Sequence, residues 1–203
     1  MPDALLDDLN PQQQRAVTAG DGQVLVLAGP GSGKTRVLTR RLAYLVERHG
    51  VPAYNIIAVT FTNKAAREME NRVVNMVQQN LEGIWLGTFH AMCARMLRRE
   101  SNYLPFKSNF VIFDADDQLS LVKRAIREMN IDDKIHRPAG IHSAISAAKN
   151  DLLTPDDMPL RTYRDEVVKR VYTRYQQMLA ASNAVDFDDL LMLAARLLQE
   201  NPG

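Results

Sequence analysis

Residues 24–35 read VLVLAGPGSGKT: an apolar run leads into a glycine-rich loop that ends in Lys34-Thr35, and a helix-forming stretch, residues 36–47, follows. Glycines let backbone N–H groups turn toward an anion, and the following helix adds the partial positive charge of its N-terminus. In such a loop the lysine reaches the β- and γ-phosphates and the threonine hydroxyl ligates magnesium. The segment therefore predicts a strand, a phosphate-binding loop and a helix, and with them a nucleotide site.

Lys34 and Thr35 are the predicted catalytic residues of this site, and Thr35 is also the predicted magnesium ligand. Ala28 stands where the general pattern has its first glycine, and it is small enough to let the loop turn back over phosphates. The alternative is a glycine-rich turn that holds no ligand. The residues predicted to hold the phosphates are Ala28, Gly29, Pro30, Gly31, Ser32, Gly33, Lys34 and Thr35.

Composition sets wide limits on the rest of the chain. Its 203 residues, 46% hydrophobic and 24% charged, suffice for one large or two small globular domains. A net charge of +1 does not by itself indicate binding to nucleic acid. The single cysteine, Cys93, cannot form an intramolecular disulfide. No apolar run approaches the roughly 20 residues of a membrane span, and the acidic N-terminus is unlike a signal peptide. We therefore predict a cytoplasmic protein that has no membrane partner.

Apolar runs and helical patterns alternate in the first part of the chain. Strands are predicted at 24–27, 56–61 and 84–86, with helices running to about residue 48 and from 63 to about 80. This βαβαβ pattern predicts a parallel sheet covered on both faces, in which ligands gather at the carboxyl ends of the strands. After residue 90 nearly every segment is helical in period, except a short run at 110–113 that resembles a strand. The predicted class is α/β, with a partial parallel sheet in residues 1–95 and a second, mainly helical domain in residues 96–203. The later helices are predicted at 91–100, 116–130, 139–150, 163–182 and 187–200.

Two predicted strands end in the same pair of residues. Thr60-Phe61 closes the second strand and is followed by Thr62-Asn63, and Thr88-Phe89-His90 closes the third. Aromatic rings beside hydroxyl and amide groups at such an edge suit single-stranded nucleic acid, because bases stack on the rings. The alternative at each site is a core phenylalanine followed by a helix cap.

Asn10-Pro11 precedes three glutamines upstream of the phosphate loop, and it predicts a helix that is capped by Asn10. A glutamine amide both donates and accepts hydrogen bonds, which is what one edge of adenine requires. Together with the loop and the two Thr-Phe ends, this segment resembles the N-terminal part of superfamily-one DNA helicases of the UvrD, Rep and PcrA type, along essentially the whole chain. Residues 9–17 look like that family's Q motif.

The resemblance implies a role for each of these residues. Gln13 would recognise adenine and Arg36 would stack on it, while Lys34 and Thr35 would hold phosphate and magnesium. The residues expected to line the DNA strand are Thr60, Phe61, Thr62, Asn63, Thr88, Phe89 and His90.

By the same resemblance the parent protein is an ATP-dependent helicase that translocates three-prime to five-prime and unwinds duplex DNA in repair or replication. Its cofactors would be ATP and Mg²⁺. Its partners would be single-stranded DNA, junctions of single- and double-stranded DNA, and possible repair or replication proteins, in a cytoplasmic, nucleoid-associated setting. Residues 96–203 would then form a helical domain inserted into a RecA-like ATP-binding domain, whose N-terminal portion is residues 1–95.

Asp114 ends the apolar run at 110–113, where a generic phosphate-loop ATPase or kinase would hold its magnesium. The spacing of Asp114 and Asp117, repeated by Asp186 and Asp189, also matches a helix-capping pair, and the resemblance favours that interpretation. The family's acidic magnesium motif would follow after residue 203, so we expect an N-terminal fragment that is inactive by itself. The alternative function is a non-enzymatic module that binds nucleotide or single-stranded DNA.

Overall fold

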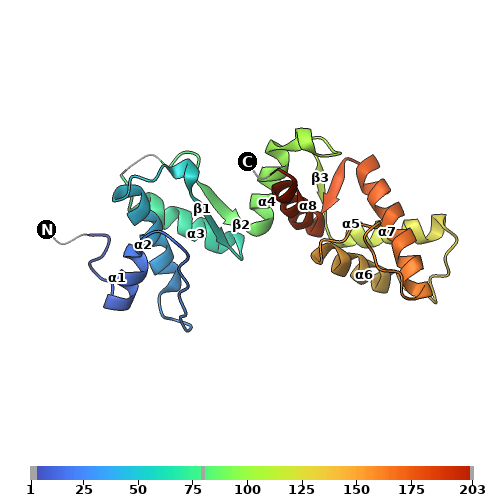
Figure 1. The fold of residues 1–203 in the computed structure, drawn as a ribbon, viewed down its shortest axis with the longest axis horizontal. Coiled ribbons are helices and arrows are strands. Elements are labelled where there is room, and N and C mark those ends of the chain that lie inside the picture. The colour runs from blue at the N-terminus through green and yellow to red at the C-terminus, as the bar shows by residue number, and fades with distance from the viewer. Residues whose placement is uncertain (1–3, 79–80, 202–203) are drawn as a thin grey trace. The chain divides into compact units, whose positions relative to one another are not determined.

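The computed structural model describes residues 4–78 and 81–201, and the chain divides into two compact units, Met1–Met92 and Cys93–Gly203 (Figure 1). The helices are α1 (Pro11–Thr18), α2 (Lys34–Glu47), α3 (Asn63–Val74), α4 (Phe89–Arg99), α5 (Ala115–Glu128), α6 (Pro138–Asn150), α7 (Tyr163–Ala181) and α8 (Phe187–Glu200), with short 3₁₀ turns at Ala53–Asn55 and Ser101–Tyr103. The strands are β1 (Ile57–Thr60), β2 (Trp85–Thr88), β3 (Val111–Phe113) and β4 (Ala184–Asp186).

The first unit is built on a parallel pair of strands. β1 and β2 run side by side with Ile57 opposite Trp85 and Thr60 opposite Thr88. Apolar side chains of α2 and α3 pack with Ala58 of β1 to form the core of this unit, while Ile57, on the other face of the same strand, is 60% exposed. One face of this sheet is therefore better covered than the other, whereas the sequence predicted cover on both.

The predicted strand at residues 24–27 is wrong. Residues 23–29 form no regular element, and their four apolar side chains are exposed: Val24 46%, Leu25 84%, Val26 48% and Leu27 87%. A strand needs a hydrogen-bonded neighbour, and in the described part of the chain β1 and β2 pair with each other. The apolar run meets the compositional requirement for a buried strand, but it has no partner strand here.

The second unit is mainly helical, as predicted, around two hydrophobic clusters. The first cluster joins α5, α6 and α7, and the second joins α4, α8, Phe110 and Val185. The strands β3 and β4 form a second short parallel pair. The sequence predicted β3 but missed β4, which is three residues long and leads directly into α8.

Side-chain caps fix the helix starts that the sequence predicted. Asn10 accepts a hydrogen bond from the Gln13 backbone N–H, and Asp114 and Asp186 cap α5 and α8 in the same way. Each of these helices has a complete capping box, in which the third helical residue bonds back to the cap. The capping interpretation of Asp114 and Asp186 is therefore confirmed.

The predicted helix from 63 to about 80 is shorter than expected. α3 ends at Val74, and Asn75 caps its C-terminus; residues 79–80 lie outside the described part of the chain. Among the described residues, no helix combines the length and the apolar character that a membrane span requires.

Candidate functional site

The glycine-rich loop leads straight into the N-terminus of α2. Gly31 and Gly33 have positive φ angles of 75° and 81°, in the left-handed region that glycine adopts without strain. Gly33 is the N-cap of α2, and no side chain caps this helix start. The first backbone N–H groups of α2 are thus left to an anion, which is how helix N-termini bind phosphate.

Lys34 is exposed, and its ammonium bonds to the loop itself. Lys34 Nζ donates to the carbonyl oxygens of Ala28 at 3.1 Å and Gly29 at 2.8 Å. Ser32 Oγ also donates to the Gly29 carbonyl, at 2.7 Å. These partners are neutral and open to solvent, so phosphate oxygens would offer the ammonium a stronger, charge-assisted alternative.

Gln13 connects α1 to the loop. Its Oε1 accepts from the Asn10 backbone N–H at 3.0 Å, and its Nε2 donates to the Ser32 carbonyl at 3.0 Å. A side-chain amide has two N–H groups and two lone pairs on its oxygen, so one donor and one acceptor site remain. Gln13 can therefore hold the loop and still meet one edge of a base.

A cavity of about 250 Å³ lies between α1 and the loop. Its lining residues are Asn10, Gln12, Gln13, Ala16, Val26, Leu27, Ala28, Ser32, Lys34 and Val37. Predicted site residues from α1, the loop and α2 thus meet at one cavity, which has both apolar and polar walls. Val26 and Leu27, which we predicted to lie in a buried strand, help to line it instead.

Arg36 does not line this cavity. It borders a separate one of about 360 Å³ together with Arg40 and Arg72, and its Nη2 lies 3.3 Å from Asp8 Oδ2. The sequence prediction missed this ion pair, although the acidic Asp7-Asp8 pair just before the α1 cap was a visible signal. In this structure, therefore, the arginine expected to stack on adenine is held beside Asp8.

Thr35 is exposed on the first turn of α2. A single hydroxyl suits Mg²⁺, which usually takes only one or two protein ligands together with phosphate oxygens and water. The donor set of the loop therefore fits a magnesium-nucleotide.

The two Thr-Phe ends lie side by side. Because Thr60 pairs with Thr88, Phe61 and Phe89 emerge together from the carboxyl ends of β1 and β2, with their ring centroids 6.4 Å apart. Phe61 is 92% exposed and Phe89 is 52% exposed. These exposures exclude the core-phenylalanine alternative at both positions.

The polar neighbours of these rings occupy defined places. Thr62 caps α3 by accepting from the Ala65 backbone N–H, and Asn63 is exposed on the first turn of that helix. Thr88 Oγ1 accepts from the Ala91 backbone N–H at 3.3 Å, and His90 is half-buried on the first turn of α4. The helix-cap part of the alternative interpretation thus holds at both Thr62 and Thr88, each beside an exposed ring.

The carboxylate of Asp114 is occupied by hydrogen bonds at the start of α5, in the second unit. Its Oδ1 accepts from the backbone N–H groups of Asp116 and Asp117 at 3.0 and 2.9 Å. This is the arrangement of a helix cap, and nothing in it resembles a magnesium site. The interpretation of Asp114 as the magnesium ligand of a phosphate-loop ATPase or kinase therefore loses its support.

Comparison with known proteins matches residues 9–203 to a family model described as the UvrD/REP helicase N-terminal domain. The chain is 45% identical over 201 residues to the ATP-dependent DNA helicase PcrA of Staphylococcus aureus (strain Mu50), and 46% identical over 200 residues to that of Bacillus subtilis (strain 168). These alignments cover 98% of this chain but only 28% and 27% of the relatives. The chain thus spans little more than a quarter of the length of these relatives, and along nearly all of its own length it belongs to the UvrD/REP helicase family.

Proposed function

We propose that this chain supplies the nucleotide loop and part of the single-strand contact of an ATP-dependent DNA helicase that moves three-prime to five-prime. The observation that carries the proposal is the pairing of Thr60 with Thr88, which sets two exposed phenylalanines side by side in the unit that also holds the glycine-rich loop. Exposed rings of this kind are stacking platforms for bases. The helicase names of the relatives support the same proposal.

At the nucleotide end, Gln13 meets the adenine edge and the loop from Ala28 to Gly33 surrounds the phosphates. Lys34 leaves the carbonyls of Ala28 and Gly29 for the β- and γ-phosphates, and Thr35 ligates Mg²⁺. When bound, the magnesium neutralises phosphate charge and orients the terminal phosphate. Arg36 must leave Asp8 before it can stack on the base.

At the DNA end, Phe61 and Phe89 take stacked bases, while phosphates and sugars meet the polar groups around the rings. Asn63 and His90 offer side-chain donors, and the uncapped portion of the α3 N-terminus adds backbone N–H groups. The remaining polar residues proposed to line this contact are Thr60, Thr62 and Thr88.

The rest of the proposal concerns the parent protein. Residues 1–95 would be the N-terminal portion of a RecA-like domain and residues 96–203 a helical insertion, in a helicase that acts on junctions during repair or replication. Its place would be the cytoplasm, on the nucleoid. The expectation that the 203-residue chain does not hydrolyse ATP efficiently stays a prediction.

The test is the binding of labelled oligo(dT) to the 203-residue chain, followed by fluorescence anisotropy. Phe61→Ala and Phe89→Ala should each weaken binding by roughly 1–3 kcal/mol, the value of one stacked base. Tyr54→Ala is the matched control, because Tyr54 is an aromatic residue of the same unit, 68% exposed, that precedes β1. Unchanged affinity in both phenylalanine variants would remove the DNA assignment.

A further inference from the structure

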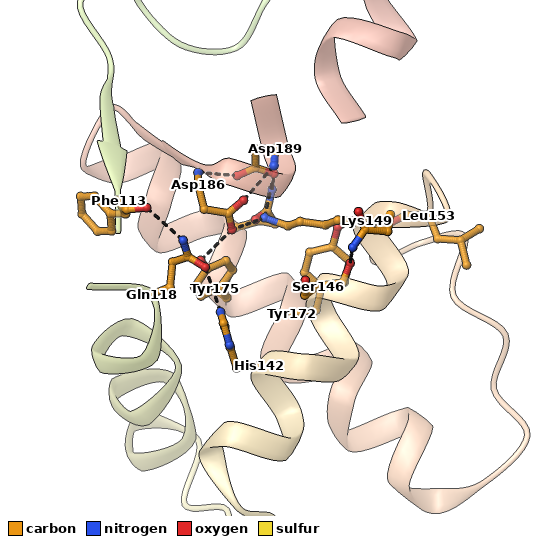
Figure 2. Close-up of polar contacts among 12 residues, drawn as sticks. Phe113, Gln118, His142, Ser146, Lys149, Leu153, Tyr172, Tyr175, Asp186 and Asp189 are labelled. Atoms are coloured by element: carbon orange, nitrogen blue, oxygen red, sulfur yellow. Dashed lines mark hydrogen bonds and ion pairs between the residues drawn. The ribbon is translucent and has the colours of Figure 1, made fainter. Parts of the chain in front are cut away.

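A lysine is enclosed in the second unit, far along the chain from the proposed nucleotide and DNA residues. Lys149, on α6, is 1% exposed, and its Nζ lies 2.6 Å from Asp186 Oδ2 and 2.7 Å from Asp189 Oδ1. Both aspartates are themselves buried, at the start of α8. Figure 2 shows the lysine side chain extended from α6 toward the two carboxylates.

Every oxygen of the two carboxylates accepts a hydrogen bond. Asp186 Oδ2 also accepts from the Tyr175 hydroxyl at 2.7 Å, and Asp189 Oδ1 accepts from Gln176 Nε2 at 3.2 Å. The two remaining oxygens accept from the backbone N–H groups of the α8 capping box, at 2.8 and 3.1 Å. We call Lys149, Tyr175, Gln176, Asp186 and Asp189 the Lys149 cluster.

Charge in the Lys149 cluster does not balance. One ammonium faces two carboxylates, and the rings of Tyr172 and Tyr175, whose centroids lie 5.7 and 5.0 Å from Lys149 Nζ, add no charge. The charged groups that act on the Asp189 carboxyl are Lys149 and Asp186. Tyr172 and Tyr175 lie against the same two carboxylates, and both tyrosines also feel the charge of Asp188, while Tyr172 feels that of Arg196 as well. Burial is the largest influence on Asp189 and raises the pKa of its carboxyl above the ordinary value, although the Lys149 charge acts in the opposite direction.

The Lys149 cluster lies where two parts of the second unit meet. Lys149 belongs to the α5–α7 bundle, whose core includes Ile145 and Val171 and also takes in Ala184 of β4, whereas Val185 of β4 and Leu190 of α8 belong to the other hydrophobic cluster. We call the latter part the β4–α8 corner. A buried ion pair that joins two apolar clusters is poor as a source of stability, but it can fix how they dock.

We propose that the Lys149 cluster is a proton-dependent lock between the α5–α7 bundle and the β4–α8 corner, closed most firmly when Asp189 takes one proton from solvent. The proton neutralises the surplus carboxylate and leaves Lys149 paired with Asp186. In the described part of the chain, Gln176 Oε1 is the buried side-chain polar atom without a hydrogen-bond partner. Rotation of the Gln176 amide would bring that oxygen to the Asp189 hydroxyl as its acceptor.

The direction of the pH effect follows from linkage. Because the Asp189 pKa is higher in the folded state than in the unfolded chain, folding takes up a proton between those two values. The contribution of Asp189 to stability is therefore fully present below the unfolded pKa and is lost as pH rises through the folded one. Exposed acids such as Asp165, whose pKa is lowered by its hydrogen bonds to Thr162, act in the opposite sense, so the effect must be read as a difference between variants.

The experiment compares the 203-residue chain with Asp189→Asn, which mimics the protonated carboxyl, and with Asp188→Asn. The latter removes the same charge from the same turn of α8 outside the Lys149 cluster. Hydrogen exchange by mass spectrometry, corrected for intrinsic rates, reports protection in α6, α7 and α8 from pH 4 to 8, with peptides of the first unit as the internal reference. Relative to Asp189→Asn, the wild-type chain should gain protection as pH falls, because burial raises the pKa of the Asp189 carboxyl in the folded state. Asp188→Asn should keep the pH dependence of the wild-type chain. The proposal would be overturned if Asp189→Asn kept that pH dependence too, or if Asp188→Asn lost it as Asp189→Asn does.

A second set of variants separates charge from packing. Lys149→Met leaves two carboxylates buried without a cation and should lower protection at pH 8 by roughly 100-fold or more. Adding Asp186→Asn and Asp189→Asn to it removes the buried charge and should restore most of that loss. If the triple variant stays as unprotected as Lys149→Met, the loss of protection comes from the packing of the lysine side chain and the proposal is wrong. If Lys149→Met does not fold, the pH profile of Asp189→Asn decides.

Discussion

Lys34 and Lys149 each place an ammonium between two oxygens, yet their surroundings differ in every other respect. Lys34 is exposed and bonds to two neutral carbonyls of its own loop, whereas Lys149 is enclosed and bonds to the carboxylates of Asp186 in β4 and Asp189 in α8. Replacing contacts of the first kind by contacts to a ligand costs little free energy, because water can satisfy the groups that are released. Contacts of the second kind resist exchange, because breaking them leaves a charged group buried without a partner. The comparison separates a lysine available for binding from one committed to structure.

The largest expected effect comes from Lys149→Met. Removing the cation should lower the unfolding free energy of the second unit by about 3–5 kcal/mol, because two carboxylates stay buried without it. Urea unfolding followed by far-UV circular dichroism measures the loss, while the single tryptophan, Trp85, reports the first unit. Lys123→Met, at an exposed lysine of α5, should leave both transitions in place. Equal midpoints for the two variants would contradict a structural role for Lys149.

Lys34→Met should have the complementary phenotype. Losing a charged donor to phosphate should weaken Mg²⁺-nucleotide binding by roughly 1.5–3 kcal/mol, or about 10- to 150-fold, with no change in either unfolding transition. Isothermal titration with a slowly hydrolysed ATP analogue gives the affinity. The control is Lys64→Met, an exposed lysine on α3 that does not line the cavity. Nucleotide affinity equal to wild type in Lys34→Met would show that the loop does not bind phosphate as proposed.

Gly33→Ala tests the backbone of the loop. An alanine there would hold a left-handed φ at a cost of about 1–2 kcal/mol, and its Cβ would meet Gln13 Nε2 at 3.0 Å. We expect weaker nucleotide binding in the same titration, since the loop and Gln13 must both shift. Gly20→Ala is the matched control, because an added Cβ at Gly20 meets nothing within 4 Å. If the two variants bind alike, the left-handed turn is not needed for the site.

The smallest effect concerns Asp8. Its ion pair with Arg36 is exposed, with the Asp8 side chain 74% accessible, so the pair is worth at most about 1 kcal/mol. Asp8→Asn should release Arg36 and raise nucleotide affinity by up to about fivefold at low salt, and the difference should vanish at high salt. Asp7→Asn controls for the general loss of one negative charge. A decrease in affinity for Asp8→Asn would mean that Asp8 helps Arg36 to reach the base.

Local signals in the sequence predicted much of this structure. Caps at Asn10, Asp114 and Asp186 depend on residues three positions apart, and both Thr-Phe ends depend on where short apolar runs stop. Each of these features depends only on residues close together in the sequence. It can therefore be predicted without knowing how distant parts of the chain pack.

Features that depend on distant partners were missed. The run at 24–27 has the composition of a buried strand, but its state depends on neighbours that its own residues do not specify. Lys149 lies in a helical pattern in which a lysine normally faces water. It is enclosed by residues more than 20 positions later, the rings of Tyr172 and Tyr175 on α7 and the carboxylates at the start of α8. Arg36 was expected beside Gln13, and a contact 28 positions upstream, at Asp8, holds it elsewhere.

The central claim is that one unit holds nucleotide at its glycine-rich loop and single-stranded DNA at the ends of β1 and β2. Hydrogen exchange by mass spectrometry of the 203-residue chain, with oligo(dT) and with a Mg²⁺-ATP analogue in turn, tests both halves at once. We predict that DNA protects residues 60–65 and 88–92 and that nucleotide protects residues 28–37. Protection by DNA confined to residues 93–203, or the absence of protection at the loop with nucleotide, would contradict the account.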